Sequence, residues 1–379
     1  MPSFYEFFAG GGMARAGLGS KWKCLFANDF DEKKAASYRE NHRGGQELLV
    51  KDVGKVTTSE LPGTADLIWA SFPCQDLSLA GMGAGLKGSR SGTFWPFWER
   101  VQSLKSEGRQ PALVVLENVC GALTAHGGQD FRSLIQALRR TGYRAGALVI
   151  DAALFLPHSR PRLFIIGVQN DVKLSPDHFC EEPQLPFHTP AIVTAYEGLS
   201  PTEKASWIWW HLPTPARRKT TFADLIEEDV SWHTKEQTQA LLNLMSPINR
   251  NKVAKAQKSG FPMVGTIYKR TRLNQDGKKT QRAEIRFDDV AGCLRTPGGG
   301  SSRQSILVVQ GDEVRSRLLS PREAARLMGL QDRYVLPKNY NDAYHLMGDG
   351  VAVPVVRHIA RHILEPLIAA VDQSAQRAA

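Results

Sequence analysis

The stretch Phe4–Gly12, FYEFFAGGG, sets the expectation for the fold of this 379-residue chain. A mostly apolar run passes directly into three glycines, which is typical of a buried strand that ends in a tight turn. Glycines at such a turn let the backbone approach a ligand closely. The dinucleotide fingerprint GxGxxG is not met, because Arg15 stands where the third glycine belongs. Taken alone, the stretch fits a purely structural turn equally well.

The same succession of apolar run, turn and helix recurs over about the first 170 residues. Further buried strands are predicted at Lys23–Ala27, Asp66–Ser71, Ala112–Leu116 and Leu163–Val168, with helices at Asp31–Asn41, Trp95–Glu107 and Asp130–Thr141. Strands that alternate with helices favour an α/β fold with an open, mostly parallel sheet. In such sheets, ligands bind at the carboxyl ends of the strands.

The composition changes after about residue 172, where prolines and short strands replace the regular alternation. The four tryptophans between residues 207 and 232 are expected in the core of a smaller, irregular, β-rich domain. Residues 250–286 hold eleven Lys/Arg and two acids, a net charge of +9. A solvated charged face is the usual explanation of such a run, but phosphate contact is favoured here.

Near the C-terminus, Ser320–Leu330 (SPREAARLMGL) predicts a helix that Ser320 caps, with Pro321 at its first position and Glu323 completing a capping box. The segment Val351–Val371 predicts a strand that runs into an amphipathic helix and returns to the first domain. We therefore expect one domain from residues 1–171 plus 345–379 and a smaller domain from residues 172–344.

The charge and the cysteines narrow the class of protein. The formal net charge of +10 favours a polyanionic partner, either nucleic acid or an anionic membrane surface. No run approaches the roughly 20 apolar residues that span a bilayer, and the N-terminus lacks a signal-peptide pattern. The five cysteines form no CxxC pair, so we expect a cytosolic protein with reduced thiols and no metal site.

Acidic residues recur at the turns that follow the predicted strands. Asp29 and Phe30 end the second strand, and Asp52 opens the turn before the next β unit. A carboxylate there suits hydrogen bonds to ribose hydroxyls, and an aromatic ring suits stacking on adenine. Each acid alone fits a solvated loop residue or a helix cap as well. Their ordered recurrence predicts a nucleoside cofactor site.

A thiol, a carboxyl and two guanidiniums lie beside the ends of predicted strands. The segment Ser71–Gln75 (SFPCQ) places Cys74 at the end of a strand and before a glycine-rich loop, where a cysteine suits nucleophilic work. Glu117 ends the next strand, and Arg160 and Arg162 occupy alternate positions that point to one face. Cys74 alone would fit a buried core thiol. The convergence of these groups on one sheet edge predicts a catalytic site.

With these residues the sequence resembles the DNA (cytosine-5) methyltransferases of bacterial restriction-modification systems. The resemblance rests, in order, on FAGGG, FPCQ, ENV, HSRPR, SPREAARLMGL and GDGVAVPV, which cover about residues 1–171 and 318–371. It implies a Rossmann-like domain that binds S-adenosylmethionine and a smaller, irregular β-rich target-recognition domain. The implied reaction is methyl transfer to C5 of a cytosine flipped out of a specific double-stranded DNA sequence.

The resemblance also implies roles for single residues. Cys74 would attack C6 of the cytosine, Glu117 would hold or protonate N3, and Arg162 would bind O2 with support from Arg160. The S-adenosylmethionine contacts it implies are Phe8, Ala9, Gly10, Gly12, Asp29, Phe30, Asp52, Val53, Pro73, Asp349 and Val351. The DNA contacts we expect are Ser78, Lys87, Arg90, Lys269, Arg270, Arg272 and Arg303. We further expect a nucleoid-associated monomer, with a cognate restriction endonuclease as a separate chain.

Three positions depart from the family's pattern. His158 stands where Gln is usual, Asp349 and Gly350 replace the Asn-Ser of the last block, and Met13 replaces a glycine. Asp349 keeps a hydrogen-bond acceptor but lacks the amide donor. None of these positions is the thiol, the carboxyl or an arginine of the site, so activity is expected to survive.

Two other functions would share these motifs. A tRNA cytosine-5 methyltransferase carries the same catalytic signature, but the basic insert of about 145 residues favours duplex DNA. A catalytically silent DNA-binding module of the same fold is the alternative outside the enzymes. Intact Cys74, Glu117 and Arg162 argue against that module.

Overall fold

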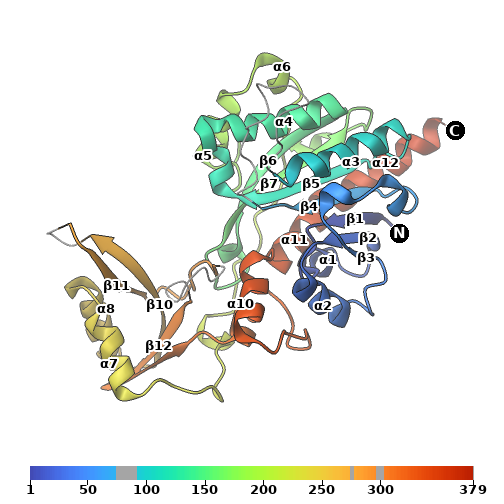
Figure 1. The fold of residues 1–379 in the computed structure, drawn as a ribbon. Coiled ribbons are helices and arrows are strands. Elements are labelled where there is room, and N and C mark those ends of the chain that lie inside the picture. The colour runs from blue at the N-terminus through green and yellow to red at the C-terminus, as the bar shows by residue number, and fades with distance from the viewer. Residues whose placement is uncertain (74–91, 274–276, 296–302, 379) are drawn as a thin grey trace. The chain divides into compact units, whose positions relative to one another are not determined.

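The computed structural model describes residues 1–73, 92–273, 277–295 and 303–378, which form two compact units (Figure 1). The first unit comprises residues 1–151, 161–216 and 353–379, and the second comprises residues 152–160 and 217–352. The predicted domain boundaries at residues 171/172 and 344/345 differ from the bounds of these compact units. The predicted division into a catalytic domain and a target-recognition domain at these residues stays a prediction.

The first unit is built on a seven-stranded sheet with the order β3-β2-β1-β4-β5-β7-β6. Its strands are β1 (Ser3–Phe7), β2 (Lys23–Asp29), β3 (Leu48–Val50), β4 (Leu67–Ser71), β5 (Leu113–Val119), β6 (Tyr143–Asp151) and β7 (Pro161–Gln169). All neighbours are parallel except the pairs that β7 makes with β5 and β6. The predicted Rossmann-like α/β fold is confirmed. The strand order reverses between β1 and β4, where doubly wound sheets bind their ligands.

The central strands are buried on both faces, which explains why their sequences are continuous apolar runs. Tyr5 and Phe7 of β1 belong to one core cluster with Phe97 of α3 (Phe94–Ser106) and Leu138 of α4 (Gln129–Thr141). Figure 1 shows both helices on the same side of the sheet. This packing holds the carboxyl ends of β1, β4 and β5 in fixed register.

The remaining helices of the first unit include both predicted and unpredicted segments. They are α1 (Met13–Leu18), α2 (Glu32–Asn41), α5 (Pro190–Glu197), α6 (Pro201–Lys204), α11 (Val353–Ile359) and α12 (Glu365–Ala378), with a π-helical turn at Ala360–Leu364. Helix α2 follows Asp31, whose side chain accepts hydrogen bonds from the first backbone amides. In the part of the chain that the structure describes, no helix has both the length and the apolar character needed to cross a bilayer.

The C-terminal segment returns to the first unit as expected, but the strand predicted near Val351 is wrong. The chain is helical from Val353, because Val355, Val356 and Ile359 have the spacing of one buried helix face. Helix α11 packs closely on α1, since a Cβ on Gly17 would lie 2.4 Å from the Cβ of Val356.

Strands β3 and β6 are absent from the sequence prediction. β3 has three residues, and Gly146 weakens the β-like pattern of β6. The glycine has a packing reason, because a Cβ there would lie 1.8 Å from the carbonyl oxygen of Ile208.

Directly after Ile208, strand β9 (Trp209–Trp210) pairs with β8 (Phe179–Cys180), and both strands belong to the first unit. Trp207 and Trp209 pack against the first unit's core, and buried Trp210 donates a hydrogen bond to the Ile166 carbonyl. The expectation that these tryptophans form the core of the smaller domain is therefore wrong for these three residues.

The second unit contains a four-stranded antiparallel sheet with the order β11-β10-β12-β13. Its elements are α7 (Lys235–Asn243), α8 (Pro247–Gln257), β10 (Met263–Leu273), β11 (Lys279–Arg286), β12 (Ser305–Gln310), β13 (Glu313–Leu318), α9 (Pro321–Leu327) and α10 (Tyr340–Asp349). Leu241 of α7 and Val253 of α8 share a core with Ile267 and Leu307 of the sheet. The prediction of a smaller β-rich domain is confirmed.

The predicted helix at Ser320 is also confirmed, together with its capping box. Ser320 Oγ accepts a hydrogen bond from the Glu323 amide at 3.0 Å, and the Glu323 carboxylate accepts one from the Ser320 amide at 2.8 Å. The same carboxylate accepts two hydrogen bonds from the buried guanidinium of Arg317, at 2.5 and 2.8 Å. This buried ion pair fixes where α9 begins.

Replacing Gly146 by Ala is expected to lower the thermal stability of the protein. The new Cβ would collide with the backbone carbonyl of Ile208, which cannot rotate away, so we expect a cost of about 1–3 kcal/mol. Gly121→Ala is the matched control, because the nearest atom to its Cβ position is 3.8 Å away. Thermal denaturation should show a lower Tm for the first variant only. Equal Tm values for the two variants would contradict the close approach.

Candidate active site

The predicted catalytic carboxyl and one predicted arginine meet on adjacent strands of the first unit. Glu117 of β5 pairs with Ser71 of β4 on one side and with Phe164 of β7 on the other. Because β7 runs antiparallel to β5, Arg162 near its beginning lies opposite Val119 near the end of β5. Arg162 Nε lies 3.4 Å from Glu117 Oε1, and the two side chains are only 14% and 7% exposed. The structure thus brings these two residues together as a mostly buried ion pair.

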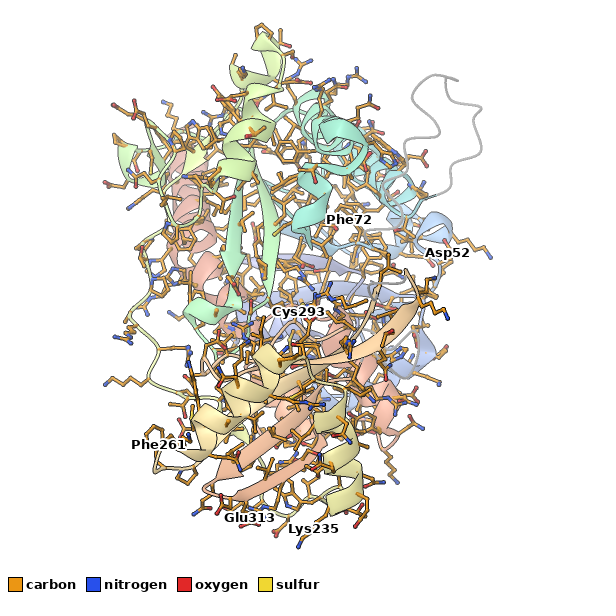
Figure 2. All side chains as sticks on the ribbon, turned by 90° about the vertical axis from the view of Figure 1, so that its left-hand side faces the viewer. Asp52, Phe72, Lys235, Phe261, Cys293 and Glu313 are labelled. Atoms are coloured by element: carbon orange, nitrogen blue, oxygen red, sulfur yellow. The ribbon has the colours of Figure 1, made fainter. Side chains whose placement is uncertain are left out.

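The segment that leads into Cys74 is anchored to the strand that carries Glu117. The Asn118 side chain donates a hydrogen bond to the carbonyl of buried Phe72 (labelled in Figure 2) at 3.1 Å, and its oxygen accepts one from the Val119 amide at 2.8 Å. Asn118 is not among the predicted site residues, although its place directly after Glu117 was the available signal. Cys74 itself lies outside the described residues, so its role as nucleophile stays a prediction.

The predicted DNA contacts in the same loop, Ser78, Lys87 and Arg90, also lie outside the described residues. Pro73 precedes them, is exposed, and follows the anchored Phe72.

The glycine turn after β1 has a backbone that ordinary residues rarely adopt. Phe8, Gly10 and Gly12 have φ values of 58°, 54° and 75°, in the left-handed region. No atom lies within 4 Å of the position that a Cβ on Gly10 would take, so the backbone there borders open space. At Gly12 a Cβ would lie 2.2 Å from the ring of His42, so a side chain there would require this ring to move. The amide of buried Ala9 bonds to the Asn28 carbonyl at 2.9 Å.

Asp29 ties the glycine turn to the end of β2. One carboxylate oxygen accepts the Gly10 amide at 2.8 Å, and the other accepts the Asp31 amide at 2.9 Å. A carboxylate has about four acceptor positions, so Asp29 retains capacity for ligand hydroxyls. The neighbouring ring of Phe30 is 69% exposed, which leaves it available for stacking. A buried acid beside an uncovered aromatic ring fits an adenosine group.

Asp52 (labelled in Figure 2) and Val53 follow β3 at the same edge of the sheet. Asp52 Oδ1 accepts the Gly54 amide at 2.7 Å and so caps the short 3-10 helix Val53–Lys55, while Val53 is buried in the core. Capping gives Asp52 a structural role as well as the predicted contact with cofactor. A second carboxylate oxygen remains as an acceptor.

Buried Glu6 and half-buried His42 lie behind the glycine turn. Glu6 of β1 accepts the Arg15 amide at 3.4 Å, and burial raises the pKa of its carboxyl to about 8. Burial likewise lowers the pKa of the His42 imidazole to about 4. At neutral pH both groups are therefore mostly uncharged, and neither adds a charge that would attract or repel a ligand at the turn.

Arg160, predicted to support catalysis, lies in the second unit and is almost fully buried. Its guanidinium donates hydrogen bonds to the carbonyls of Gly348 at 2.7 Å, Gly350 at 2.6 Å and Leu294 at 3.2 Å. These hydrogen bonds hold the backbone at these three carbonyls, so Arg160 is a positioning residue. The alternation that would pair Arg160 with Arg162 is interrupted because β7 begins only at Pro161.

His158 and the last sequence block also lie in the second unit. Buried His158 accepts the Leu294 amide at Nε2 (3.2 Å), and its Nδ1 lies 2.8 Å from the Leu327 carbonyl. The departure from glutamine at this position therefore serves internal packing. Asp349 is exposed at the end of α10 and Val351 is buried, and their predicted cofactor contacts stay predictions.

The four remaining predicted DNA contacts lie in the second unit. Arg270 and Arg272 are exposed on β10, and Lys269, directly before Arg270, is half-buried. Arg303 lies over the ring of Tyr340, 5.3 Å from its centroid, and donates a hydrogen bond to Asn341. Their contacts with DNA stay predictions.

Comparison with known sequences assigns almost the whole chain to one family model. Residues 3–365 match the model described as C-5 cytosine-specific DNA methylase. The type II methyltransferase M.HpaII of Haemophilus parainfluenzae is 26% identical over 384 residues, which cover 96% of this chain and 90% of that protein. The type II methyltransferase M1.ScrFI of Lactococcus lactis subsp. cremoris is 25% identical over 365 residues, covering 96% of this chain and 78% of that protein.

Solved structures show the same fold. The Dnmt2 methyltransferase of S. pombe superposes with a TM-score of 0.57 at 16% identity, over 97% of this chain and 99% of that one. A putative DNA modification methyltransferase encoded within an E. coli prophage gives a TM-score of 0.54 at 17% identity, over 97% and 100%. At these identities the likeness shows the fold alone.

Phe30→Ala is expected to weaken binding of S-adenosylmethionine by roughly tenfold, because the exposed ring is the surface on which we expect the adenine to stack. Isothermal titration calorimetry on the full chain would measure the Kd. Phe261→Ala is the matched control, since Phe261 is 62% exposed in the second unit, at the surface in Figure 2. An unchanged Kd for Phe30→Ala would contradict the assignment of the adenine site.

Proposed function

The chain belongs to the C-5 cytosine-specific DNA methylase family and is a DNA (cytosine-5-)-methyltransferase, and on this premise we propose that Cys74 is its nucleophile. The proposed reaction methylates C5 of a cytosine flipped out of a specific double-stranded sequence, through a bond between Cys74 and C6 of the base. The Glu117–Arg162 ion pair carries the proposal, because Glu117 lies on β5, next to the strand that leads into Cys74, and Arg162 lies on β7, the next strand of the sheet. S-adenosylmethionine, when bound, supplies an electrophilic methyl group.

The chemistry explains why a thiol and a carboxyl are needed together. C5 of cytosine is a weak nucleophile, but addition of the Cys74 thiolate to C6 makes it the electron-rich carbon of an enamine. Hydrogen bonding or proton donation from Glu117 to N3 takes up the charge that this addition places on the ring. After C5 carries its methyl group, loss of the C5 proton to a base restores the double bond and expels the thiolate.

Arg162 and Glu117 offer complementary groups to one edge of the cytosine ring. A guanidinium only donates hydrogen bonds, so Arg162 suits the O2 carbonyl, while a carboxyl can accept or donate at N3. The ion pair at 3.4 Å holds both groups in place before a base arrives. Such preorganisation reduces the entropy lost when the base binds. Arg160 acts indirectly in this proposal, through the carbonyls that it holds.

The residues at the carboxyl ends of β1 to β3 would hold the cofactor. The open space at Gly10, the acceptor capacity of Asp29 and the uncovered ring of Phe30 support this placement. The other assigned positions in this unit are Phe8, Ala9, Gly12, Asp52, Val53 and Pro73. Asp349 and Val351 are the two further positions proposed to contact S-adenosylmethionine.

Double-stranded DNA is the proposed substrate, and base flipping is required because C5 and C6 are inaccessible in a stacked duplex. The type II methyltransferases to which the chain is similar support a restriction-modification context, with the endonuclease as a separate chain. The enzyme would then act on nucleoid DNA in the cytoplasm. The basic charge of the second unit's strands favours duplex DNA over tRNA as substrate.

Cys74→Ser is expected to abolish covalent trapping of the enzyme. DNA prepared with 5-fluorocytosine in place of cytosine contains every target, and fluorine at C5 blocks the final elimination, so the wild type with cofactor should form a stable adduct. Denaturing gel electrophoresis would detect that adduct. Absence of an adduct with the wild type, or labelled methyl transfer to tRNA and not to DNA, would contradict the proposed reaction.

Glu117→Gln is expected to reduce the single-turnover methylation rate by roughly 10²–10⁴-fold, since it removes the group that supports charge at N3. The Kd for S-adenosylmethionine should stay unchanged, which separates this effect from unfolding. Glu197→Gln, an exposed glutamate on α5, is the matched control and should retain full activity. A rate within threefold of wild type for Glu117→Gln would refute the role of this carboxyl.

A further inference from the structure

Strands β10 and β11 continue beyond the four-stranded sheet as a two-stranded ribbon (Figure 1). β12 pairs with β10 only over residues 263–267, whereas β11 pairs with β10 from Thr266 to Leu273. Within the described chain, the six residues 268–273 therefore have a strand partner on one side only. At about 3.4 Å per residue, this part of the ribbon is about 20 Å long.

We name residues 268–273 and 278–284 the basic ribbon. Its described residues include one acid, Glu284, and six cations, which are Lys269, Arg270, Arg272, Lys278, Lys279 and Arg282. Arg270 lies directly opposite Arg282 in the strand register, and like charges in that position destabilise a sheet. A ribbon that keeps this repulsion is suited to a polyanionic partner, which would neutralise it.

The two faces of the basic ribbon differ in chemistry. Alternate side chains place Arg270, Arg272 and Arg282 on one face, which we call the arginine face. The opposite face carries Lys269 and Lys279, and at its base it continues into the core that α7 and α8 cover. Lys269 there also lines a cavity of about 510 Å³ together with residues of α7. The arginine face is therefore the one turned away from these helices.

Two arginines of the arginine face are held in place by neighbours. Glu284 accepts a hydrogen bond from Arg272 Nε at 2.8 Å and lies 3.3 Å from Arg270 Nε. Arg270 also lies 5.9 Å from the ring centroid of Tyr268, whose hydroxyl donates to the Cys293 carbonyl at 3.3 Å. Held side chains lose less entropy on binding than free ones. Arg282 forms no carboxylate ion pair among the described residues.

We propose that the basic ribbon enters the major groove of the DNA substrate and that its arginine face reads base edges. This inference rests on the proposed function, because it assigns target reading within the same reaction. The major groove, about 12 Å wide, admits a two-stranded ribbon, and a guanidinium can donate two hydrogen bonds to O6 and N7 of guanine. The lysines on the opposite face then contact phosphates, which adds affinity without sequence information. The target sequence therefore contains guanine at positions that the arginine face contacts.

The test uses the purified full-length chain, S-adenosylmethionine and a duplex library with a randomised segment, and bisulfite sequencing locates the methylated cytosines. Arg282→Lys keeps the charge but removes the planar pair of donors. We expect it to reduce discrimination at one position of the target by roughly tenfold or more, while the salt dependence of DNA binding stays as in the wild type. Lys279→Ala should instead weaken all sequences alike and reduce the slope of log K against log salt by about 0.9.

Arg315→Lys is the matched control, because Arg315 is an exposed arginine of the same sheet, on β13 outside the basic ribbon. It should leave the target sequence unchanged. Arg270→Lys is a second variant on the arginine face, and melting curves confirm that each variant is folded. An unchanged target profile for both arginine-face variants would overturn the inference. A uniform loss of methylation over all sequences would overturn it as well. A wild type that methylates no duplex would contradict the proposed function instead.

Discussion

The antiparallel pairing of β7 with β5 is the interaction on which the candidate site depends. In a fully parallel sheet, the start of one strand lies at the opposite edge from the end of its neighbour, and Arg162 could not reach Glu117. Reversal of β7 places the beginning of that strand beside the carboxyl end of β5. A slip of one residue in this register would turn Arg162 to the other face of the sheet. The geometry of the Glu117–Arg162 pair is therefore held by main-chain hydrogen bonds rather than by side chains alone.

At the edge of the sheet where we propose that the cofactor binds, side-chain hydrogen bonds hold neighbouring strand ends together. The carboxylate of Asp29 holds the amide of Gly10, so the turn after β1 and the end of β2 keep a constant separation. Asn118 does the same for the segment before Cys74, through the carbonyl of Phe72. In both cases a buried polar side chain joins two neighbouring strand ends, and so fixes the backbone next to the proposed site residues.

Much of the first unit could be predicted because its strands are continuous apolar runs that alternate with segments of helical composition. The Glu117–Arg162 pair followed from residue types at strand ends. Strand β6 could not be predicted, because Gly146 is explained only by the carbonyl of Ile208, which is distant in sequence. The tie between Arg160 and the Gly348 and Gly350 carbonyls was equally hidden, since no local pattern marks a side chain that binds a remote backbone.

The left-handed backbone of Phe8 sets stability against the cofactor contact that we propose for this residue. A phenylalanine with φ of 58° costs about 1–2 kcal/mol relative to a relaxed backbone, and glycine there would remove that cost. The ring nevertheless packs edge-on against Phe97, with centroids 6.0 Å apart, and so forms a rigid wall beside the turn. Selection for thermostability alone would therefore favour glycine at position 8, which would remove the ring that packs against Phe97. Consensus-based stabilisation of this enzyme should leave position 8 untouched.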